Sequence, residues 1–244
     1  MKKVLLIVTG CIATYKIPII MTMLRKKCPD IYIKVMTTKK ALDFITPTVL
    51  QTRADEYLST SMIGKKITHI DSVQDLDVLA VVPATANTIA KISHGMAGSL
   101  ALSAILATPM NVPRIIFPAM NSNMYLNIAT QKNIDVLIRN QWYIVKPVVG
   151  NLACGINGVG KLPSVSTVVD RILELGRIKV KIKDEAKNSQ FWFSNHVGEI
   201  FDVVKCHANI SNEFVTFPTN DYAVVDPLDH SRFIFITGDM CEEI

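Results

Sequence analysis

Short apolar runs that end in glycine or small polar residues recur along the first 150 residues. The run 77–82, DVLAVV, is too short and too rich in β-branched residues for a helix, and too uniformly apolar for a half-exposed strand. It predicts a strand that is buried on both faces and ended by Pro83, then a polar connection, Ala84–Thr88, and a helix from Ile89. Ligands of open parallel sheets bind outside the carboxyl ends of such strands, so the site is expected here.

The same succession of strand, turn and helix repeats on both sides of this run. The predicted strands are 3–8, 31–36, 77–82, 114–117 and 142–147. The predicted helices are 15–27, a short one that holds 41–44, 47–50, 89–105, 124–140 and 164–175. Because parallel strands need crossover helices, this order predicts an α/β fold with a doubly wound parallel sheet. Residues 54–68 predict a less regular connection, and 150–161 a glycine-rich loop.

The pattern changes after Gly176, which is typical of a helix end. Residues 178–183 alternate between apolar and basic side chains, as in a half-exposed or edge strand. Three more runs resemble strands, namely 214–217, 222–225 and 232–237. We therefore expect one domain over 1–176 and a β-rich C-terminal extension over 177–244, whose role the pattern does not indicate.

Composition indicates a globular protein. The chain has 244 residues, of which 49% are hydrophobic, so it can bury a substantial core. No stretch approaches the roughly 20 consecutive apolar residues that span a bilayer. The apolar run after Met1-Lys2-Lys3 is shorter than that of a signal peptide and ends at Gly10. We expect a cytoplasmic protein with no membrane partner.

Charge and cysteine content argue against a nucleic-acid-binding protein, a disulfide-rich protein and a zinc-binding protein. The net charge of +5 comes from basic pairs scattered along the chain, and aromatic residues make up only 7%, so a nucleic-acid partner is not expected. The five cysteines form no CxxC pair, which indicates neither a disulfide framework nor a structural zinc site. No metal is expected, and the cysteines fit a reducing compartment.

Small polar residues at three predicted strand ends form a candidate ligand site. Gly10–Ala13 combines a glycine turn with a helix start, whose N–H groups can bind a phosphate. Thr38 follows the next strand, and Thr85 and Thr88 follow the central one. A mononucleotide pocket and ordinary turn chemistry both account for these residues. The chain has no GxGxxG motif, which argues against a dinucleotide.

Three further residues are candidates for chemistry, each with a simpler structural alternative. His69 precedes the central strand and is either catalytic or a structural histidine. Cys154 lies in the glycine-rich loop, where a thiol can close over a site or can be half-buried and inert. Asn121 follows a strand end and can bind a carboxylate or cap the next helix.

Four motifs together resemble one family. They are 10–16 (GCIATYK), 83–88 (PATANT), 118–125 (PAMNSNMY) and 152–155 (LACG) with Gly158 and Gly160. In this order they resemble the homo-oligomeric flavin-containing cysteine decarboxylases, and within that family the branch that acts on phosphopantothenoylcysteine. The resemblance covers about the first 175 residues and leaves the C-terminal extension outside.

The resemblance implies a Rossmann-like fold, FMN as cofactor, and a homotrimer or dodecamer with flavin sites between subunits. It implies oxidation of a cysteinyl thiol by FMN and loss of the carboxylate as CO2, with His69 as the active-site histidine and Cys154 as a clamp thiol that donates a proton. The implied substrate contacts are Asn121, which holds the carboxylate, and Met120, Met124 and Ala153. The implied FMN contacts are Gly10, Cys11, Ala13, Thr38, Phe44, Thr85, Asn87 and Thr88.

Other features leave two alternatives open. Gly98-Ser99, Ile128 and Lys161-Leu162 stand where the family usually has Asp-Asn, Pro and Arg-Met. These differences and the extension favour a peptidyl-cysteine decarboxylase of lantibiotic biosynthesis, whose product is an enethiol, whereas Cys154 favours the coenzyme A pathway. The second alternative is a flavin-binding regulatory subunit without turnover, against which the presence of both His69 and Cys154 argues.

Overall fold

The computed structural model describes most of the chain, in two compact units. The described residues are 1–58, 68–175, 177–184, 197–205, 211–212, 215–216, 222–225, 233–236 and 241–243. Unit 1 comprises Met1–Pro109 and Arg114–Glu174, and unit 2 comprises Met110–Pro113 and Leu175–Ile244.

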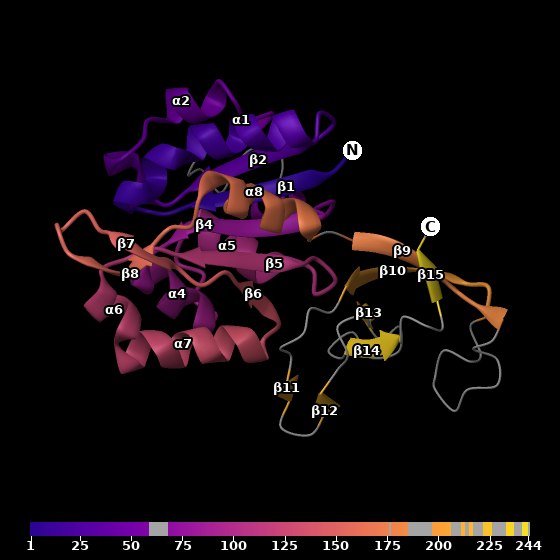
Figure 1. Cartoon of the computed structure of the whole chain (residues 1–244). Helices are drawn as coiled ribbons and strands as arrows, with labels where there is room; N and C mark the ends of the chain where they lie inside the picture. Colours follow the sequence, from indigo (N-terminus) through magenta and orange to yellow (C-terminus); the bar gives the residue numbers. More distant parts are fainter. Residues whose placement is uncertain are drawn as a thin grey trace. The chain divides into compact units, whose positions relative to one another are not determined.

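Unit 1 is built on a six-stranded sheet in the order β3-β2-β1-β4-β5-β6 (Figure 1). Its strands are β1 (Lys3–Val8), β2 (Tyr32–Thr37), β3 (Glu56–Leu58), β4 (Val78–Ala84), β5 (Arg114–Pro118) and β6 (Trp142–Ile144). Every neighbouring pair is parallel, and Val4 on β1 lies opposite both Ile33 and Val78. The chain runs outward from β1 to β3 and then from β4 to β6 on the other side. The predicted doubly wound parallel sheet is confirmed.

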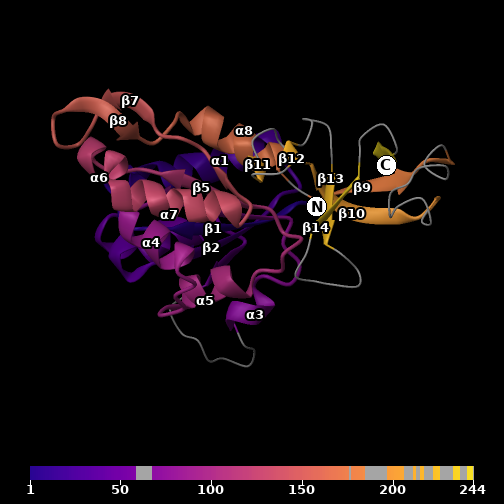
Figure 2. The same cartoon turned by 90° about the horizontal axis from the view of Figure 1, so that it is seen from below.

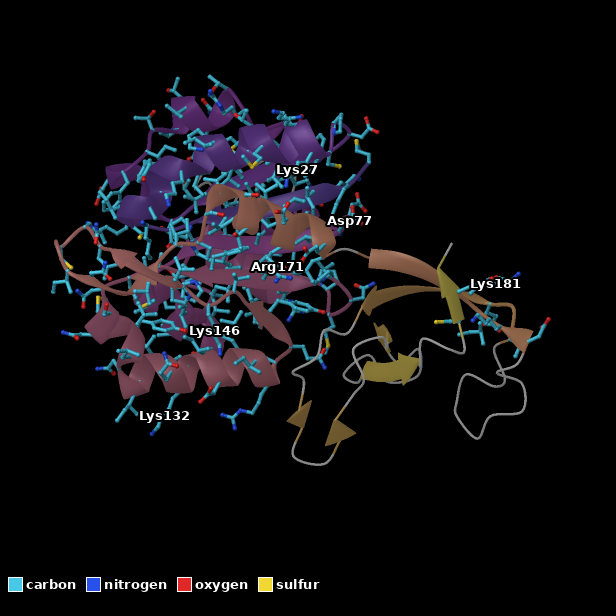
Figure 3. The ribbon with its side chains drawn as sticks, viewed as in Figure 1. Lys27, Asp77, Lys132, Lys146, Arg171 and Lys181 are labelled. Atoms are coloured by element: carbon cyan, nitrogen blue, oxygen red, sulfur yellow. The ribbon has the colours of Figure 1, made fainter. Side chains whose placement is uncertain are left out.

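Helices cover both faces of this sheet. They are η1 (Ile12–Lys16), α1 (Ile17–Lys27), η2 (Lys39–Asp43), α2 (Pro47–Gln51), α3 (Thr68–Asp71), α4 (Ala86–Ser93), α5 (Leu100–Ala107), α6 (Ser122–Leu126), α7 (Ile128–Arg139) and α8 (Val165–Glu174). Figure 1 shows α1 and α8 on one side of the sheet and α4 and α7 on the other. Lys27 pairs with Asp170 where α1 meets α8 (Figure 3), although an exposed ion pair contributes little stability. Among the described residues, no helix has the length and apolar character needed to cross a membrane.

The two central strands form the middle of the core. The side chains of Val4–Val8 on β1 and of every residue on β4 are buried. Burying a full aliphatic side chain contributes roughly 1.5–3 kcal/mol, so uniformly apolar runs favour the centre of a sheet that helices cover on both faces. The structure confirms the two-sided burial that the sequence predicted for the run 77–82.

Pro83 lies inside β4, whereas the sequence predicted that it would end the strand. Proline has no N–H for the hydrogen-bond ladder and is tolerated where the pairing is irregular. The register between β4 and β5 shifts between Val81 and Ala84, which accommodates the proline. The strand therefore ends at Ala84 and delivers Thr85 directly to its tip.

Other elements also differ from the prediction. The predicted helix 89–105 is two helices, α4 and α5, which residues 94–99 separate. The short strand β3 lies in the stretch predicted to be irregular, and it pairs with β2 despite having no apolar run. The predicted helix 124–140 is two helices, because the Asn127 side chain caps α7 by accepting from the Ala129 N–H at 2.9 Å. The predicted loop 150–161 is largely an antiparallel hairpin of β7 (Val148–Asn151) and β8 (Asn157–Lys161).

Unit 2 contains a five-stranded sheet in the order β14-β13-β10-β9-β15, in which neighbouring strands are antiparallel. Its strands are β9 (Arg177–Ile182), β10 (Ile200–Lys205), β13 (Tyr222–Val225), β14 (Phe233–Ile236) and β15 (Cys241–Glu243), and β11 (Ser211–Asn212) pairs separately with β12 (Val215–Thr216). β9 has a strand on each side, so the alternation in 178–183 does not mark an edge strand. The ends of the predicted runs 214–217 and 232–237 lie outside the described residues, as does Gly176.

Thr9 connects the tips of β1 and β4. Its side chain is fully buried, and Oγ1 donates to the Pro83 carbonyl oxygen at 2.6 Å and accepts from the Thr85 N–H at 3.2 Å. Thr14 Oγ1 donates in turn to the Thr9 carbonyl oxygen at 2.8 Å. These bonds fix the start of η1 and the start of α4 relative to each other.

Thr9→Val should destabilise unit 1, because the Pro83 carbonyl and the Thr85 N–H lose a buried partner while the side-chain shape is kept. The expected loss of unfolding free energy is about 1–3 kcal/mol, measured by urea denaturation. Thr48→Val is the matched control, since Thr48 is exposed on α2 and its hydroxyl has no partner within the described part of the chain. Equal losses in the two variants would contradict the role of Thr9.

Candidate functional site

Three of the predicted ligand-binding segments meet at one edge of the six-stranded sheet. Gly10–Ala13 follows β1, Thr38 follows β2 and Thr85–Thr88 follows β4, and these parallel strands end at the same edge. The Thr38 N–H donates to the Val8 carbonyl oxygen at 2.9 Å, which holds the tips of β1 and β2 together. The polar residues at the strand ends therefore form one contiguous region.

Gly10 lets two backbone segments touch in this region. A Cβ at Gly10 would lie 2.6 Å from the Lys40 carbonyl oxygen and 2.7 Å from Lys40 Cβ. No side chain fits at such distances, so only glycine allows η2 to approach the turn before η1. The contact places η2, which Thr38 precedes and Phe44 follows, against the turn at Gly10.

The side chains at these strand ends differ in what they can offer a ligand. The Thr38 hydroxyl and the Asn87 amide have no hydrogen-bond partner among the described residues, and Phe44 is 44% exposed. Thr85 and Thr88 bond each other at 3.0 Å, and Thr85 Oγ1 also accepts from the Thr88 N–H at 3.3 Å as the N-cap of α4. The region thus presents a hydroxyl, an amide and an aromatic ring.

The β7–β8 hairpin docks on the tip of β5. The Met120 N–H donates to the Gly160 carbonyl oxygen at 3.0 Å. A Cβ at Gly160 would lie 2.1 Å from the Met120 carbonyl oxygen, and one at Gly158 would lie 2.3 Å from Ser122 Oγ. Gly160 also has a φ of +138°, which other residues rarely adopt. The hairpin reaches the sheet only because both positions are glycine.

This docking places Cys154 beside Asn121. Asn121 caps α6, because its Oδ1 accepts from the Asn123 N–H at 2.9 Å. Its Nδ2 donates to Cys154 Sγ at 3.3 Å. Asn121 is therefore a helix cap, which is the simpler of its two interpretations. Its amide also contacts the exposed thiol of Cys154.

The two thiols of the site lie in different environments. Cys154 is exposed, and a hydrogen bond from the Ile156 backbone, with a second from the Asn121 amide, lowers the pKa of its thiol. Cys11 is half-buried and donates to the Ala119 carbonyl oxygen at 3.5 Å, and burial raises its pKa. Cys154 is thus the thiol that exchanges its proton more readily.

The predicted substrate contacts flank this pair in the chain. Met120 is half-buried, Ala153 is exposed, and Met124 on α6 is 50% exposed. Apolar side chains that stay open beside a few polar groups are typical of a site for an organic ligand. Their roles as substrate contacts stay predictions.

The fold does not bring His69 to the Asn121–Cys154 pair within one chain. His69 lies on α3, which packs against α5, and Figure 2 shows this helix apart from β7 and β8. His69 Nδ1 is buried and has no hydrogen-bond partner in the described ranges. Within one chain, His69 and Cys154 therefore lie in separate places.

Thr9, which connects the tips of β1 and β4, was not among the predicted site residues. Its signal was available, because Thr9 is a small polar residue between five buried apolar positions and Gly10. Such a hydroxyl must find partners when the strand is buried, and the nearest backbone groups belong to the neighbouring strand tip. The hairpin contact of Ser122 with Gly158 had no comparable signal, because those residues are distant in sequence.

The first 176 residues of the chain are similar to known proteins. A family model described as Flavoprotein matches residues 1–176. The probable phosphopantothenoylcysteine decarboxylase of Streptococcus mutans is 35% identical over 177 residues, which cover 71% of this chain and 98% of the relative. The coenzyme A biosynthesis bifunctional protein CoaBC of Escherichia coli is 38% identical over 173 residues, covering 69% of this chain and 42% of the relative. The chain thus matches less than half the length of the bifunctional relative.

Solved structures share the fold. A PPC decarboxylase complexed with pantothenoylaminoethenethiol superposes with a TM-score of 0.64 at 26% identity, covering 70% of this chain and 96% of that one. The peptidyl-cysteine decarboxylase EpiD gives a TM-score of 0.61 at 26% identity, covering 71% and 99%. The FMN binding protein AtHal3 gives 0.61 at 26% identity, covering 70% and 95%.

Iodoacetamide should modify Cys154 faster than Cys11, because Cys154 is exposed with a lowered pKa and Cys11 is half-buried with a raised one. Asn121→Ala removes a donor that stabilises the Cys154 thiolate, so the pH at which alkylation reaches half its maximal rate should rise. Peptide mass spectrometry across a pH series measures both effects. Asn123→Ala is the control, since this exposed α6 side chain has no partner within the described ranges. An unchanged profile in Asn121→Ala would rule out the amide–thiol interaction.

Proposed function

We propose that this chain, which belongs to the Flavoprotein family, is an FMN-dependent decarboxylase that converts phosphopantothenoylcysteine in coenzyme A biosynthesis. The observation that carries the proposal is the Asn121–Cys154 pair at the tip of β5, held by the docked hairpin. An amide donor for a carboxylate and an ionisable thiol lie side by side, next to strand ends that suit a mononucleotide.

The strand-end residues fit FMN. Gly10 and Cys11 precede η1 and Ala13 lies in its first turn, so their backbone N–H groups would bind the phosphate. The Thr38 hydroxyl at the next strand tip, which has no partner among the described residues, would bind it as well. The exposed Phe44 ring and the Asn87 amide would contact the remainder of the flavin. The bonded pair Thr85 and Thr88 would form one edge of the flavin pocket. When bound, FMN supplies the two-electron oxidation of the substrate thiol and returns those electrons when the product is a saturated thiol.

The chain's own residues then supply binding and proton transfer. Asn121 Nδ2 would hold the cysteinyl carboxylate on Cα. Once the adjacent Cβ, which carries the sulfur, is oxidised to a thioaldehyde, the carboxylate would leave as CO2 and its electron pair would pass into the C=S group, which becomes the enethiol. His69 would accept the proton from the substrate thiol, since a neutral imidazole is a base near neutral pH. Cys154 would donate a proton to the enethiol that decarboxylation forms. Met120, Met124 and Ala153 would cover the substrate and exclude water.

We also propose that the active assembly is a homotrimer, alone or as part of a dodecamer, with each site formed between two subunits. The separation of α3 from the hairpin supports this, because one chain does not hold His69 and Cys154 together. Exposed apolar side chains next to the strand ends support it as well: Ile12 is 56%, Tyr15 is 61% and Ile19 is 51% exposed. A monomer rarely leaves such side chains clustered in water. The four described cysteines are free, in keeping with a cytoplasmic enzyme.

The first prediction of this proposal concerns the substrate. The purified protein should release FMN on denaturation and should liberate CO2 from phosphopantothenoylcysteine. A peptide ending in cysteine is the comparison, because EpiD, a peptidyl-cysteine decarboxylase, has the same fold. Turnover of the peptide alone would replace the proposed substrate with the lantibiotic type. Retained FMN without CO2 from either compound would indicate a flavin-binding regulatory subunit.

The second prediction concerns Cys154. Cys154→Ser should still release CO2 from phosphopantothenoylcysteine in a single turnover but should accumulate the enethiol, because the serine hydroxyl is too weak an acid to replace the thiol. Mass spectrometry separates the enethiol from the saturated thiol by their difference of about two mass units, the two hydrogens that the reduction adds. Cys28→Ser, at a half-buried thiol that follows α1, is the control and should give the saturated product. Identical products from all three proteins would end the proton-donor role.

A further inference from the structure

A lysine lies inside the buried part of β2. Lys34 is 9% exposed, and the other residues of the strand from Ile33 to Thr37 are buried as well. Lysine is rarely buried unless its ammonium group has partners, because removing a cation from water is costly. Lys34 therefore needs a partner outside its own strand.

The partner is the C-terminal end of α3. Lys34 Nζ donates to the Ser72 carbonyl oxygen at 3.2 Å, and Glu56 Oε2 on β3 lies 4.0 Å from the same Nζ. Ser72 directly follows α3, so its carbonyl oxygen is not used by the hydrogen bonds of the helix. A lysine that donates to a carbonyl oxygen at the end of a helix stabilises that end. Because Ser72 is only 3% exposed, water does not readily replace Lys34 there.

Ser72 links this lysine to the turn that contains His69. The Ser72 N–H donates to the Thr68 carbonyl oxygen at 3.1 Å, and Oγ donates to the His69 carbonyl oxygen at 3.5 Å. The next residue, Val73, is 1% exposed and anchors the chain in the core. A chain of contacts therefore runs from the Lys34 ammonium group through Ser72 to the backbone of His69.

The helix α3 depends on such contacts for its position. It has four residues, Thr68–Asp71, and a single helical turn is unstable on its own. Its other support is packing against α5 (Figure 2). His69 Nδ1 is buried and has no hydrogen-bond partner in the described ranges, so no described group orients the ring through this nitrogen. The place of the imidazole is therefore set by the backbone of α3, which Lys34 holds at its end.

We propose that Lys34 is a positioning residue for His69. It acts through α3 rather than on the substrate, because it fixes the helix that carries the imidazole. This rests on the proposed function and extends it to a residue in the interior of the sheet. In that function His69 acts when the substrate thiol is oxidised, and Cys154 acts in the later protonation. Lys34 should therefore matter for the oxidation step alone.

Lys34→Met tests the proposal, because it removes the donor and keeps the apolar stem of the side chain. Stopped-flow absorbance after mixing with phosphopantothenoylcysteine measures the rate at which bound flavin is reduced. This rate should fall about tenfold to a hundredfold, since a displacement of about 1 Å in a reacting group can cost a factor of this size. kcat should fall with it, while KM and the content of bound FMN stay near those of the wild type. Lys34→Arg, which keeps a donor, should recover most of the rate.

Lys2→Met is the matched control. Lys2 Nζ donates to the Leu173 carbonyl oxygen at 2.6 Å, near the end of α8 instead of α3. Both variants take a lysine away from a carbonyl oxygen at a helix end, so both should lose stability in urea. Only Lys34→Met should slow flavin reduction. Ser72→Ala is a milder variant, which removes the hydroxyl that bonds the His69 carbonyl oxygen and should slow reduction by a smaller factor.

Combining Lys34→Met with His69→Asn separates a positioning role from a general structural one. Without the imidazole, Lys34→Met should lower the residual rate of flavin reduction no further. An additional loss in that background, equal slowing in Lys2→Met, or a wild-type rate in Lys34→Met would overturn the proposal. Should Lys34→Met fail to fold, a wild-type rate in Ser72→Ala would overturn it instead. A wild-type protein whose flavin the substrate does not reduce would refute the proposed function itself.

Discussion

The site depends on two places where a backbone touches another backbone with no side chain between them. At Gly10 a Cβ would lie 2.6 Å from the Lys40 carbonyl oxygen, and at Gly160 it would lie 2.1 Å from that of Met120. The first contact brings η2 to the turn before η1, and the second brings the β7–β8 hairpin to the tip of β5. A larger residue at either position would push apart segments that hydrogen bonds hold together. The geometry of the site therefore requires glycine at both positions.

The parallel sheet and the hairpin contribute different residues to the site. The buried strands β1 and β4 fix the positions of Thr9 and Thr85, and rigid strand ends allow a small number of polar groups to be placed accurately. The hairpin adds Cys154 from outside the sheet and pairs it with Asn121. His69 belongs to neither group, since α3 lies with α5. One subunit therefore provides an incomplete set of the residues that the proposed reaction uses, and a second subunit of the proposed trimer would complete it.

Much of this arrangement follows from the sequence, because buried parallel strands have a strong and local signature. The runs 3–8 and 77–82 predict their strands, and small polar residues after them predict the strand-end region. The hairpin and β3 could not be predicted in the same way. β3 has no apolar alternation, and β7 and β8 depend on glycines whose partners, Met120 and Ser122, lie far away in the chain. Pro83 was misplaced because the irregular pairing that tolerates it involves another strand.

Two of the departures from the family pattern keep the local structure. Ser99 Oγ accepts from the Leu102 N–H at 3.3 Å and caps α5, a role that asparagine also fills. Ile128 is the first residue of α7, after the Asn127 cap, where proline is favoured for its backbone but is not required. The third departure, Lys161, keeps the positive charge of the arginine that is usual at this position. None of the three disturbs the Asn121–Cys154 pair.

The central claim is that each active site takes His69 from one subunit and Asn121 with Cys154 from another. Co-expression of His69→Asn and Cys154→Ser chains with different affinity tags, followed by purification on both tags, isolates mixed oligomers. Neither variant alone should form the saturated thiol from phosphopantothenoylcysteine. A mixed trimer should regain it at about one site in three, because one of its three interfaces joins an intact His69 to an intact Cys154. Mixed oligomers that bind FMN but form no saturated thiol would show that the two residues do not complete each other's sites.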